Sequence, residues 1–175
     1  MADILDMIMK RRSIRVFTRE PMDEETLTQL LKAGMAAPSA SNSQPWEFLV
    51  VTDEKLLGEL QSKLKYGKYN APAAIVVLGN LEIAKNESAF RFWVQDCAAA
   101  TENILIAAAN MGLGTVWIGA YPKEDVIQTL REILDIPENV QPLSVIYVGH
   151  PAEEKPARTQ YEEQRVHWQK YTAQK

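Results

Sequence analysis

The sequence predicts a single domain of α/β type, in which helices and strands interleave around one sheet, followed by a C-terminal arm. The 175 residues are sufficient for one domain with a substantial core. Segments with helical apolar spacing alternate along the chain with short, continuous apolar runs that are typical of buried strands. From His150 on, the chain is polar, with Trp168 and Tyr171 as aromatic anchors, so the arm has no core of its own.

Apolar spacing and capping residues define the expected elements. The expected helices are residues 3–11, the segment from the cap Asp23 to Gly34–Pro38, the segment from the cap Asp53 to Leu64, and residues 88–111 and 123–134. The expected strands are residues 46–52, 73–79, 114–118 and 143–149. In the longest helix the inward stripe is predicted to be Trp93, Cys97, Ala100, Ile104, Ala107 and Met111, with Gly112 as the C-terminal cap.

The longest helix is rich in alanine, which allows other helices to approach it closely. Together with an arm that needs a surface to lie on, this composition favours a homodimer. A central helix in a monomer would have a similar composition, so the alanine content does not decide between the two.

Composition and charge exclude several classes of protein. There are 19 basic and 23 acidic residues, a net charge of −4, which argues against a nucleic-acid-binding protein. No apolar run has the length of a membrane span, and residues 1–12 do not resemble a signal peptide. The single cysteine, Cys97, is expected to be a small buried hydrophobic residue. We therefore expect a cytoplasmic protein.

Common catalytic motifs are missing from the sequence. Gly112-Leu113-Gly114 begins like a dinucleotide-binding fingerprint but follows a helix and opens a strand, which is the reverse of the required context. With only His150, His167 and Cys97 available, neither a metal site nor a nucleophile paired with histidine is expected. If the protein is an enzyme, a bound organic cofactor is expected to carry the chemistry.

Two polar clusters are candidates for binding such a cofactor. Arg11, Arg12, Ser13 and Arg15 could surround a phosphate, although the negative end of a helix dipole requires the side chains themselves to supply the charge. Basic residues that merely complement that dipole would look the same. Residues 38–46 (PSASNSQPW) place hydroxyl and amide groups in a proline-stiffened loop, which is equally the composition of an ordinary turn.

Two further segments add to these clusters. Residues 112–121 contain glycines at positions 112, 114 and 119, which would let a flat ring approach the main chain. Residues 149–158 contain Lys155 and Arg158, either of which could close a phosphate site from the other side.

In this order and spacing, RRSIRVF, PSASNSQPW, GLGTVWIG and GHPAEEKPAR resemble the nitroreductase superfamily over residues 3–158. The resemblance implies an α+β fold, with a central mixed or antiparallel sheet flanked by helices, in an intertwined homodimer. Residues 1–158 would form the domain that binds flavin mononucleotide (FMN). Residues 159–175 would form an arm that packs on the partner subunit.

The resemblance also implies the roles of individual residues. The implied FMN-binding residues are Arg11, Arg12, Ser13, Arg15 and Arg158 around the phosphate and ribityl chain, Ser39, Ser41 and Asn42 from the partner subunit, and main-chain N–H groups near Gly119 and Ala120 at the N5–O4 edge. Some family members have a lysine that reaches the flavin, and here Lys65 and Lys68 are the two candidates. Phe90, Phe92 and Tyr121 are candidates for the substrate pocket, near the variable segment 80–92, whereas Trp93 is expected in the core.

The implied chemistry is two-electron, ping-pong transfer from NADH or NADPH, through FMN, to a nitroaromatic, a quinone or a related small oxidant. No side chain has to act as nucleophile or base. The alternatives are a divergent flavoprotein of the dehalogenase or flavin-degrading type, a non-catalytic FMN-binding protein, and a helix-rich interaction module without a ligand. The sequence indicates neither the physiological oxidant nor the preference between NADH and NADPH.

Overall fold

The computed structural model describes residues 4–171, so residue 3 of the first expected helix and residues 172–175 of the expected arm lie outside the described part. The elements in chain order are α1 (Ile4–Lys10), α2 (Glu24–Met35), the 3₁₀ turn η1 (Ala40–Asn42), β1 (Trp46–Val51), α3 (Glu54–Lys63), β2 (Ala73–Asn80), α4 (Ala89–Asn110), β3 (Gly114–Gly119), α5 (Glu124–Leu134), β4 (Val140–Gly149) and the 3₁₀ turn η2 (Glu163–Arg165).

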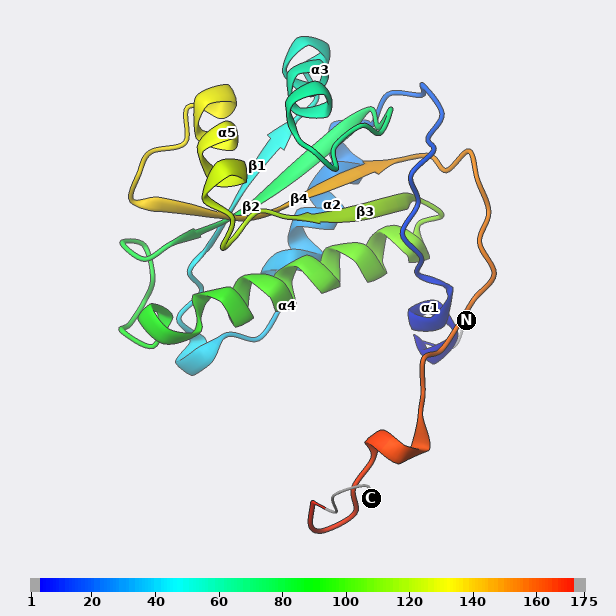
Figure 1. Cartoon of the computed structure of the whole chain (residues 1–175), viewed down its shortest axis with the longest axis vertical. Coiled ribbons are helices and arrows are strands. Elements are labelled where there is room, and N and C mark those ends of the chain that lie inside the picture. The colour runs from blue at the N-terminus through cyan, green and yellow to red at the C-terminus, as the bar shows by residue number, and fades with distance from the viewer. Residues whose placement is uncertain (1–3, 172–175) are drawn as a thin grey trace.

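The strands form one antiparallel sheet in the order β1-β2-β4-β3. α3 and α5 cover one face of the sheet, and α2 and α4 cover the other (Figure 1). Each face has its own core, because alternate residues of a strand point to opposite faces. The fold is therefore α+β, as the resemblance implies, with an antiparallel sheet.

The local signals predicted the elements well, with one clear difference. β4 begins at Val140, three residues before the expected strand. The sequence Gln141-Pro142 argues against a strand interior because proline lacks an N–H donor. Here the pairing with β2 shifts register between Val77 and Leu78, and Pro142 pairs with Leu78 at that irregularity. The bulge thus allows the proline within the strand.

The candidate binding residues lie near the two ends of α4. Four residues of its predicted stripe are buried, namely Trp93, Cys97, Ala100 and Ile104. At the C-terminal end the stripe is wrong, because Met111 is 42% exposed and Ala108 is buried instead. Gly112 follows the helix with a φ of 75°, which confirms the predicted glycine cap.

The segment after α1 lies against the edge of the sheet. The N–H of Ile14 donates to the carbonyl oxygen of Thr115 at 2.8 Å, and Phe17 forms an antiparallel bridge with Pro151. The C-terminal tail returns past α1, where the N–H of Arg158 donates to the carbonyl oxygen of Met9 at 3.1 Å. The two ends of the sequence are thereby brought together.

Residues 159–171 of the tail extend away from the body of the molecule (Figure 1). Its aromatic residues are largely uncovered, with Trp168 79% and Tyr171 82% exposed. The apolar residues Ile4 and Leu5 of α1 are also more than half exposed. Within residues 4–171, no helix has the length and apolar character needed to cross a membrane.

Candidate functional site

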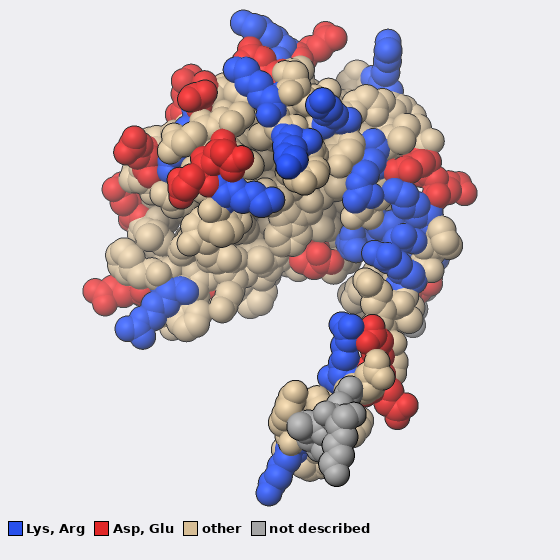
Figure 2. Space-filling view, viewed as in Figure 1, with Lys and Arg blue, Asp and Glu red and all other residues tan. Residues whose placement is uncertain are grey.

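A cationic hollow lies where α1, the C-terminal end of α4 and the returning tail meet. It has a volume of about 170 Å³, and Lys10, Arg12 and Lys155 line it together with Ala109 and Thr115. Figure 2 shows Lys and Arg side chains gathered over this part of the molecule. Because these cations come from the two ends of the sequence, the fold creates a concentration of positive charge that the net charge of −4 conceals.

The tail is fixed to the N-terminal segment by polar contacts at this hollow. The ammonium group of Lys155 donates to the carbonyl oxygen of Ser13 at 2.6 Å and to the carboxylate of Glu153 at 2.9 Å. The guanidinium of Arg12 donates to the carbonyl oxygen of Pro156. The carboxylate of Glu153 accepts the N–H of Arg15 at 2.5 Å. This hydrogen bond, and secondarily the one from Lys155, lowers the pKa of Glu153. The carboxylate therefore stays ionised and orients both partners.

The remaining predicted arginines border this region. The Arg11 guanidinium lies 3.5 Å from the carboxylate of Glu102 on α4. Burial raises the pKa of Glu102, and the charge of Arg11 offsets part of that rise. Arg15 and Arg158 are exposed. Of the predicted phosphate-binding residues, Arg12 lines the cationic hollow, whereas Arg11, Ser13, Arg15 and Arg158 do not line it. Their role at a phosphate remains a prediction.

Gly119, at the end of β3, presents a main-chain donor at the sheet edge. The N–H of Ala120 donates to the carbonyl oxygen of Leu143 at 2.9 Å. Because hydrogen-bonded and non-bonded pairs alternate along an antiparallel ladder, the N–H of Gly119 points away from β4. A Cβ at Gly119 would meet no atom within 4 Å, so open space adjoins this residue. Gly119 and Ala120 are the two residues whose main-chain N–H groups are expected at the flavin edge. The N–H of Gly119 points outward, whereas the N–H of Ala120 already donates to an acceptor inside the sheet.

A second hollow, of about 180 Å³, adjoins Gly119 and contains Lys65, Tyr66 and Lys123. The ammonium groups of Lys65 and Lys123 lie 5.5 Å and 5.7 Å from the centre of the Tyr66 ring. Lys68 instead lines a separate hollow on the α3 side, with Gly58. The sequence left the choice between the two lysines open, and the structure places Lys65 next to Gly119.

The edge of β3 connects the two hollows. Thr115 lines the cationic hollow, and Gly119 lines the other. At a rise of about 3.3 Å per residue, four residues of strand separate them by roughly 13 Å. A phosphate joined through a five-carbon chain to a tricyclic ring spans such a distance. The cationic end, the strand edge and the outward N–H therefore fit FMN.

The Ser39–Gln44 loop, with the predicted Ser39, Ser41 and Asn42, has an unusual backbone. Ser41, Asn42 and Gln44 all have positive φ, between 49° and 56°. This conformation costs on the order of 1 kcal/mol for each residue other than glycine, so the surroundings must stabilise it. The buried carboxylate of Asp96 on α4 accepts hydrogen bonds from the loop.

This loop lies at the opposite end of α4 from the cationic hollow. The hydroxyl group of Ser41 is 3.0 Å from that of Ser88, just before α4 begins. Ala109, at the other end of the helix, lines the cationic hollow. Ala109 lies 21 positions after Ser88, which corresponds to about 32 Å of helix. One chain therefore does not place Ser41 and Arg12 around the same phosphate and ribityl chain.

The candidate pocket aromatics differ in burial. Phe90 is 65%, Phe92 39% and Tyr121 41% exposed, so these side chains are accessible in one chain. Trp93 is 9% exposed, which confirms that it belongs to the core, and its ring meets Tyr121 edge to face at 4.9 Å. The buried Trp93 ring therefore packs against the more exposed ring of Tyr121.

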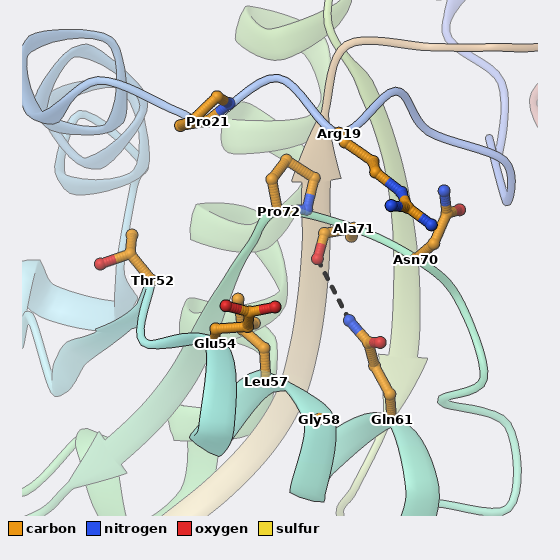
Figure 3. A pocket seen from close by; sticks show the side chains of 10 residues that line it. All are labelled: Arg19, Pro21, Thr52, Glu54, Leu57, Gly58, Gln61, Asn70, Ala71 and Pro72. Atoms are coloured by element: carbon orange, nitrogen blue, oxygen red, sulfur yellow. Dashed lines mark hydrogen bonds between the residues drawn. The ribbon is translucent and has the colours of Figure 1, made fainter.

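A wider hollow of about 660 Å³ lies between α3 and the segment after Phe17 (Figure 3). Its amide groups hold the fold together: the amide of Gln61 donates to the carbonyl oxygen of Ala71 at 3.1 Å. The Asn70 amide both accepts from the N–H of Phe17 and donates to its carbonyl oxygen. None of the sequence clusters lies here.

Cys97 has the structural role that the sequence predicted. Its side chain is fully buried, and its thiol lies 3.6 Å from the carbonyl oxygen of Leu78. Burial, and secondarily the negative charge of Asp96, raises the pKa of the thiol to about 12. The thiol is therefore protonated at neutral pH and is a poor nucleophile.

Sequence reasoning did not identify Asp96 as a functional residue. A signal was present in the sequence, because a carboxylate interrupts the mostly apolar face of α4 next to Cys97. Buried acids are rare unless they have partners. Those partners, Ala40 and Ser43, are more than 50 residues away in sequence, so local spacing could not reveal them.

The antiparallel α+β fold, the cationic hollow and the glycine strand edge suit a phosphorylated ring cofactor. The comparisons with known proteins identify the family. The profile of the nitroreductase family matches residues 8–66 and 58–150. The chain belongs to the nitroreductase family.

Similar proteins extend over nearly the whole chain. A protein of Archaeoglobus fulgidus, provisionally named as an NADH dehydrogenase or NAD(P)H nitroreductase, is 44% identical over 98% of this chain and 100% of its own length. A crystal structure from Parabacteroides distasonis, with the same provisional name, is 36% identical at a TM-score of 0.90, covering 98% of this chain and 100% of its own. A nitroreductase-like protein of Desulfovibrio desulfuricans, crystallised with FMN, is 29% identical at a TM-score of 0.79, covering 98% and 99%.

Proposed function

We propose that this protein is an FMN-dependent oxidoreductase that takes electrons from NADH or NADPH and reduces nitroaromatics, quinones or related small oxidants. The observation that carries the proposal is the β3 edge, which joins a cationic hollow to an outward main-chain donor. FMN bound to the similar D. desulfuricans protein and the name of the A. fulgidus relative support the choice of cofactor and electron donor.

The residues of the chain have distinct roles in this proposal. Lys10, Arg12 and Lys155 bind the phosphate, since charge-assisted hydrogen bonds to a dianion are the strongest available contacts. Gly119 donates its N–H to the edge of the ring, and Lys65 adds positive charge beside it. Both contacts stabilise the reduced form of the ring, which carries extra electron density.

Bound FMN supplies the two-electron chemistry, by accepting and releasing hydride at its ring. No side chain is required as nucleophile or base. The exposed Phe92 and Tyr121 offer flat apolar surfaces on which an aromatic oxidant can stack. A planar, electron-accepting substrate is therefore the class that these residues suit.

The proposal includes a homodimer with two shared sites. A partner chain supplies its Ser39, Ser41 and Asn42, because these residues lie about 32 Å along α4 from the chain's own cationic hollow. The arm, residues 159–175, packs on the partner subunit. This packing buries the side chains of Trp168 and Tyr171, which belong to the arm. The exposed apolar residues of α1 and of the arm support an extensive apolar interface.

Absorption spectroscopy of the purified protein tests the function. FMN-loaded protein should lose its visible flavin absorbance under anaerobic NADH or NADPH and recover it when a nitroaromatic or quinone is added. A protein that takes up no FMN would overturn the proposal. Bound FMN that neither nucleotide reduces would indicate a binding protein without turnover.

A further inference from the structure

Asp96 is a buried carboxylate whose two hydrogen bonds within residues 4–171 both go to one loop. Its side chain is on α4, and the residue is 4% exposed. One carboxylate oxygen accepts the N–H of Ala40 at 2.9 Å, and the other accepts the hydroxyl of Ser43 at 2.9 Å. A charge buried this deeply requires partners, and both of its partners belong to the Ser39–Gln44 loop.

The loop depends on such an anchor. Ser41, Asn42 and Gln44 occupy the left-handed region, which residues other than glycine keep only when their surroundings hold them there. Within the loop, the N–H of Gln44 donates to the Ser39 hydroxyl at 3.1 Å, and its amide donates to Asn42 at 2.6 Å. These bonds shape the loop internally. Asn86, Ser88 and the N–H of Lys85 hold Ser41 and Ser43 from the segment before α4, and the bonds to Asp96 attach the loop to α4 itself.

Packing of α4 does not itself require a carboxylate at this position. The helix is held by apolar neighbours on the same buried face, among them Trp93, Cys97 and Ala100. Asp96 instead places an acceptor under Ala40 and another beside Ser43. Its position therefore serves the loop more than the core.

We propose that Asp96 is a positioning residue for the Ser39–Gln44 loop, and that it acts across the dimer. The inference rests on the proposed function, in which this loop contributes to the FMN site of the partner subunit. Asp96 of one chain then sets the FMN affinity of the site built on the arginines of the other chain.

Substitutions at Asp96 test the positioning role through the dissociation constant of FMN, measured by flavin fluorescence. Asp96→Ala should weaken FMN binding at least about tenfold, since two hydrogen bonds are lost. Asp96→Asn should rescue most of the affinity, because its carbonyl accepts from Ala40 and its amide donates to the Ser43 hydroxyl. Ser43→Ala, which removes one bond, should give an intermediate value.

Asp53→Ala is the matched control for loss of stability. Asp53 caps α3 by accepting the N–H of Leu56 at 2.9 Å, and within the described residues it makes no hydrogen bond or ion pair with the loop. This variant should lower the melting temperature and leave the affinity for FMN unchanged. Equal FMN affinity in Asp96→Ala and wild type would overturn the inference while leaving the proposed function intact. Failure of the wild type to bind FMN would overturn the proposed function itself.

Heterodimers with two different tags test action across the dimer. In one heterodimer, the first chain carries Arg12→Ala with Lys155→Met, and the second carries Asp96→Ala. If Asp96 acts on the partner's site, both defects fall on one site, and the heterodimer retains one FMN site of wild-type affinity. Placing all three substitutions in one chain, opposite a wild-type partner, should damage both sites.

The converse result distinguishes action within one chain. If the three-substitution chain with a wild-type partner keeps a tight site, and the mixed heterodimer has none, Asp96 acts on the site of its own chain. That outcome would overturn the inference. FMN stoichiometry is the readout in both cases, so the result does not depend on turnover or on the identity of the oxidant.

Discussion

The ammonium group of Lys155 donates a hydrogen bond to the carbonyl oxygen of Ser13 at 2.6 Å, across 142 residues of sequence. With Glu153 as a second partner, Lys155 fixes the tail against the segment after α1. This contact brings a C-terminal cation into the same hollow as Lys10 and Arg12. The proposed phosphate site therefore depends on tail docking as well as on the arginine motif.

Lys155→Met should weaken FMN binding about 10- to 100-fold, because a hydrogen bond that involves a charged group contributes about 1.5–3 kcal/mol. The measurement is the dissociation constant of FMN, compared with that of riboflavin, which has no phosphate. Lys55→Met, an exposed lysine of α3, is the control. An equal loss of riboflavin and FMN affinity would contradict a phosphate contact.

Gly119→Pro removes the outward N–H at the end of β3 without breaking a bond to β4. We expect the two-electron potential of bound FMN to fall by about 20–60 mV, the equivalent of about 1–3 kcal/mol. Gly119→Ala keeps the N–H, and its Cβ enters open space, so it should leave the potential unchanged. Anaerobic redox titration distinguishes the two variants, and equal potentials would argue against this donor.

Lys65→Ala and Lys68→Ala form a matched pair on either side of Tyr66-Gly67. Lys65 lines the hollow at Gly119, whereas Lys68 lines another hollow with Gly58. Removing the positive charge of Lys65 should lower the potential of bound FMN, by some tens of millivolts for about 1–2 kcal/mol of lost interaction. Lys68→Ala should match the wild type in the same titration. The reverse pattern would show that the other lysine reaches the ring.

Deletion of the arm, residues 159–175, should weaken dimerisation at least about 100-fold, because large apolar side chains contribute most to such interfaces. Within the arm, Tyr161 and Trp168 are 68% and 79% exposed in one chain. Sedimentation velocity over a concentration series measures the effect, and Trp168→Ala in the full chain should reproduce part of it. An unchanged dimer constant would show that the arm does not pack on the partner.

Stability should fall at alkaline pH because of Cys97. Burial raises the pKa of this thiol from its ordinary value of 9.0 to about 12 in the folded protein. The fold thus favours the neutral thiol, so its contribution is complete below pH 9 and is lost as the pH rises toward 12. Between pH 8 and 10 the free energy of unfolding should fall by about 1 kcal/mol more in the wild type than in Cys97→Ala. Parallel urea titrations at the two pH values measure the difference, and identical pH slopes would contradict it.

The sequence alone predicted nearly every helix and strand, because helical and strand periodicity and capping residues such as Asp23 and Asp53 are local signals. It also identified the arginine cluster and the serine-rich loop as candidate binding residues. Local spacing could not predict the three extra residues of β4, whose Pro142 is accommodated by a bulge set by its pairing with β2.

The tertiary structure decided how these parts relate in space. It placed Lys155 beside Ser13, Lys65 beside Gly119, and Asp96 beneath a loop more than 50 residues away. It also placed the serine-rich loop and the arginine cluster at opposite ends of α4, which is why the proposed shared site requires a second chain. Periodicity along a sequence reports only neighbours within a few turns, whereas distances between elements depend on how the sheet pairs and how α4 packs across it.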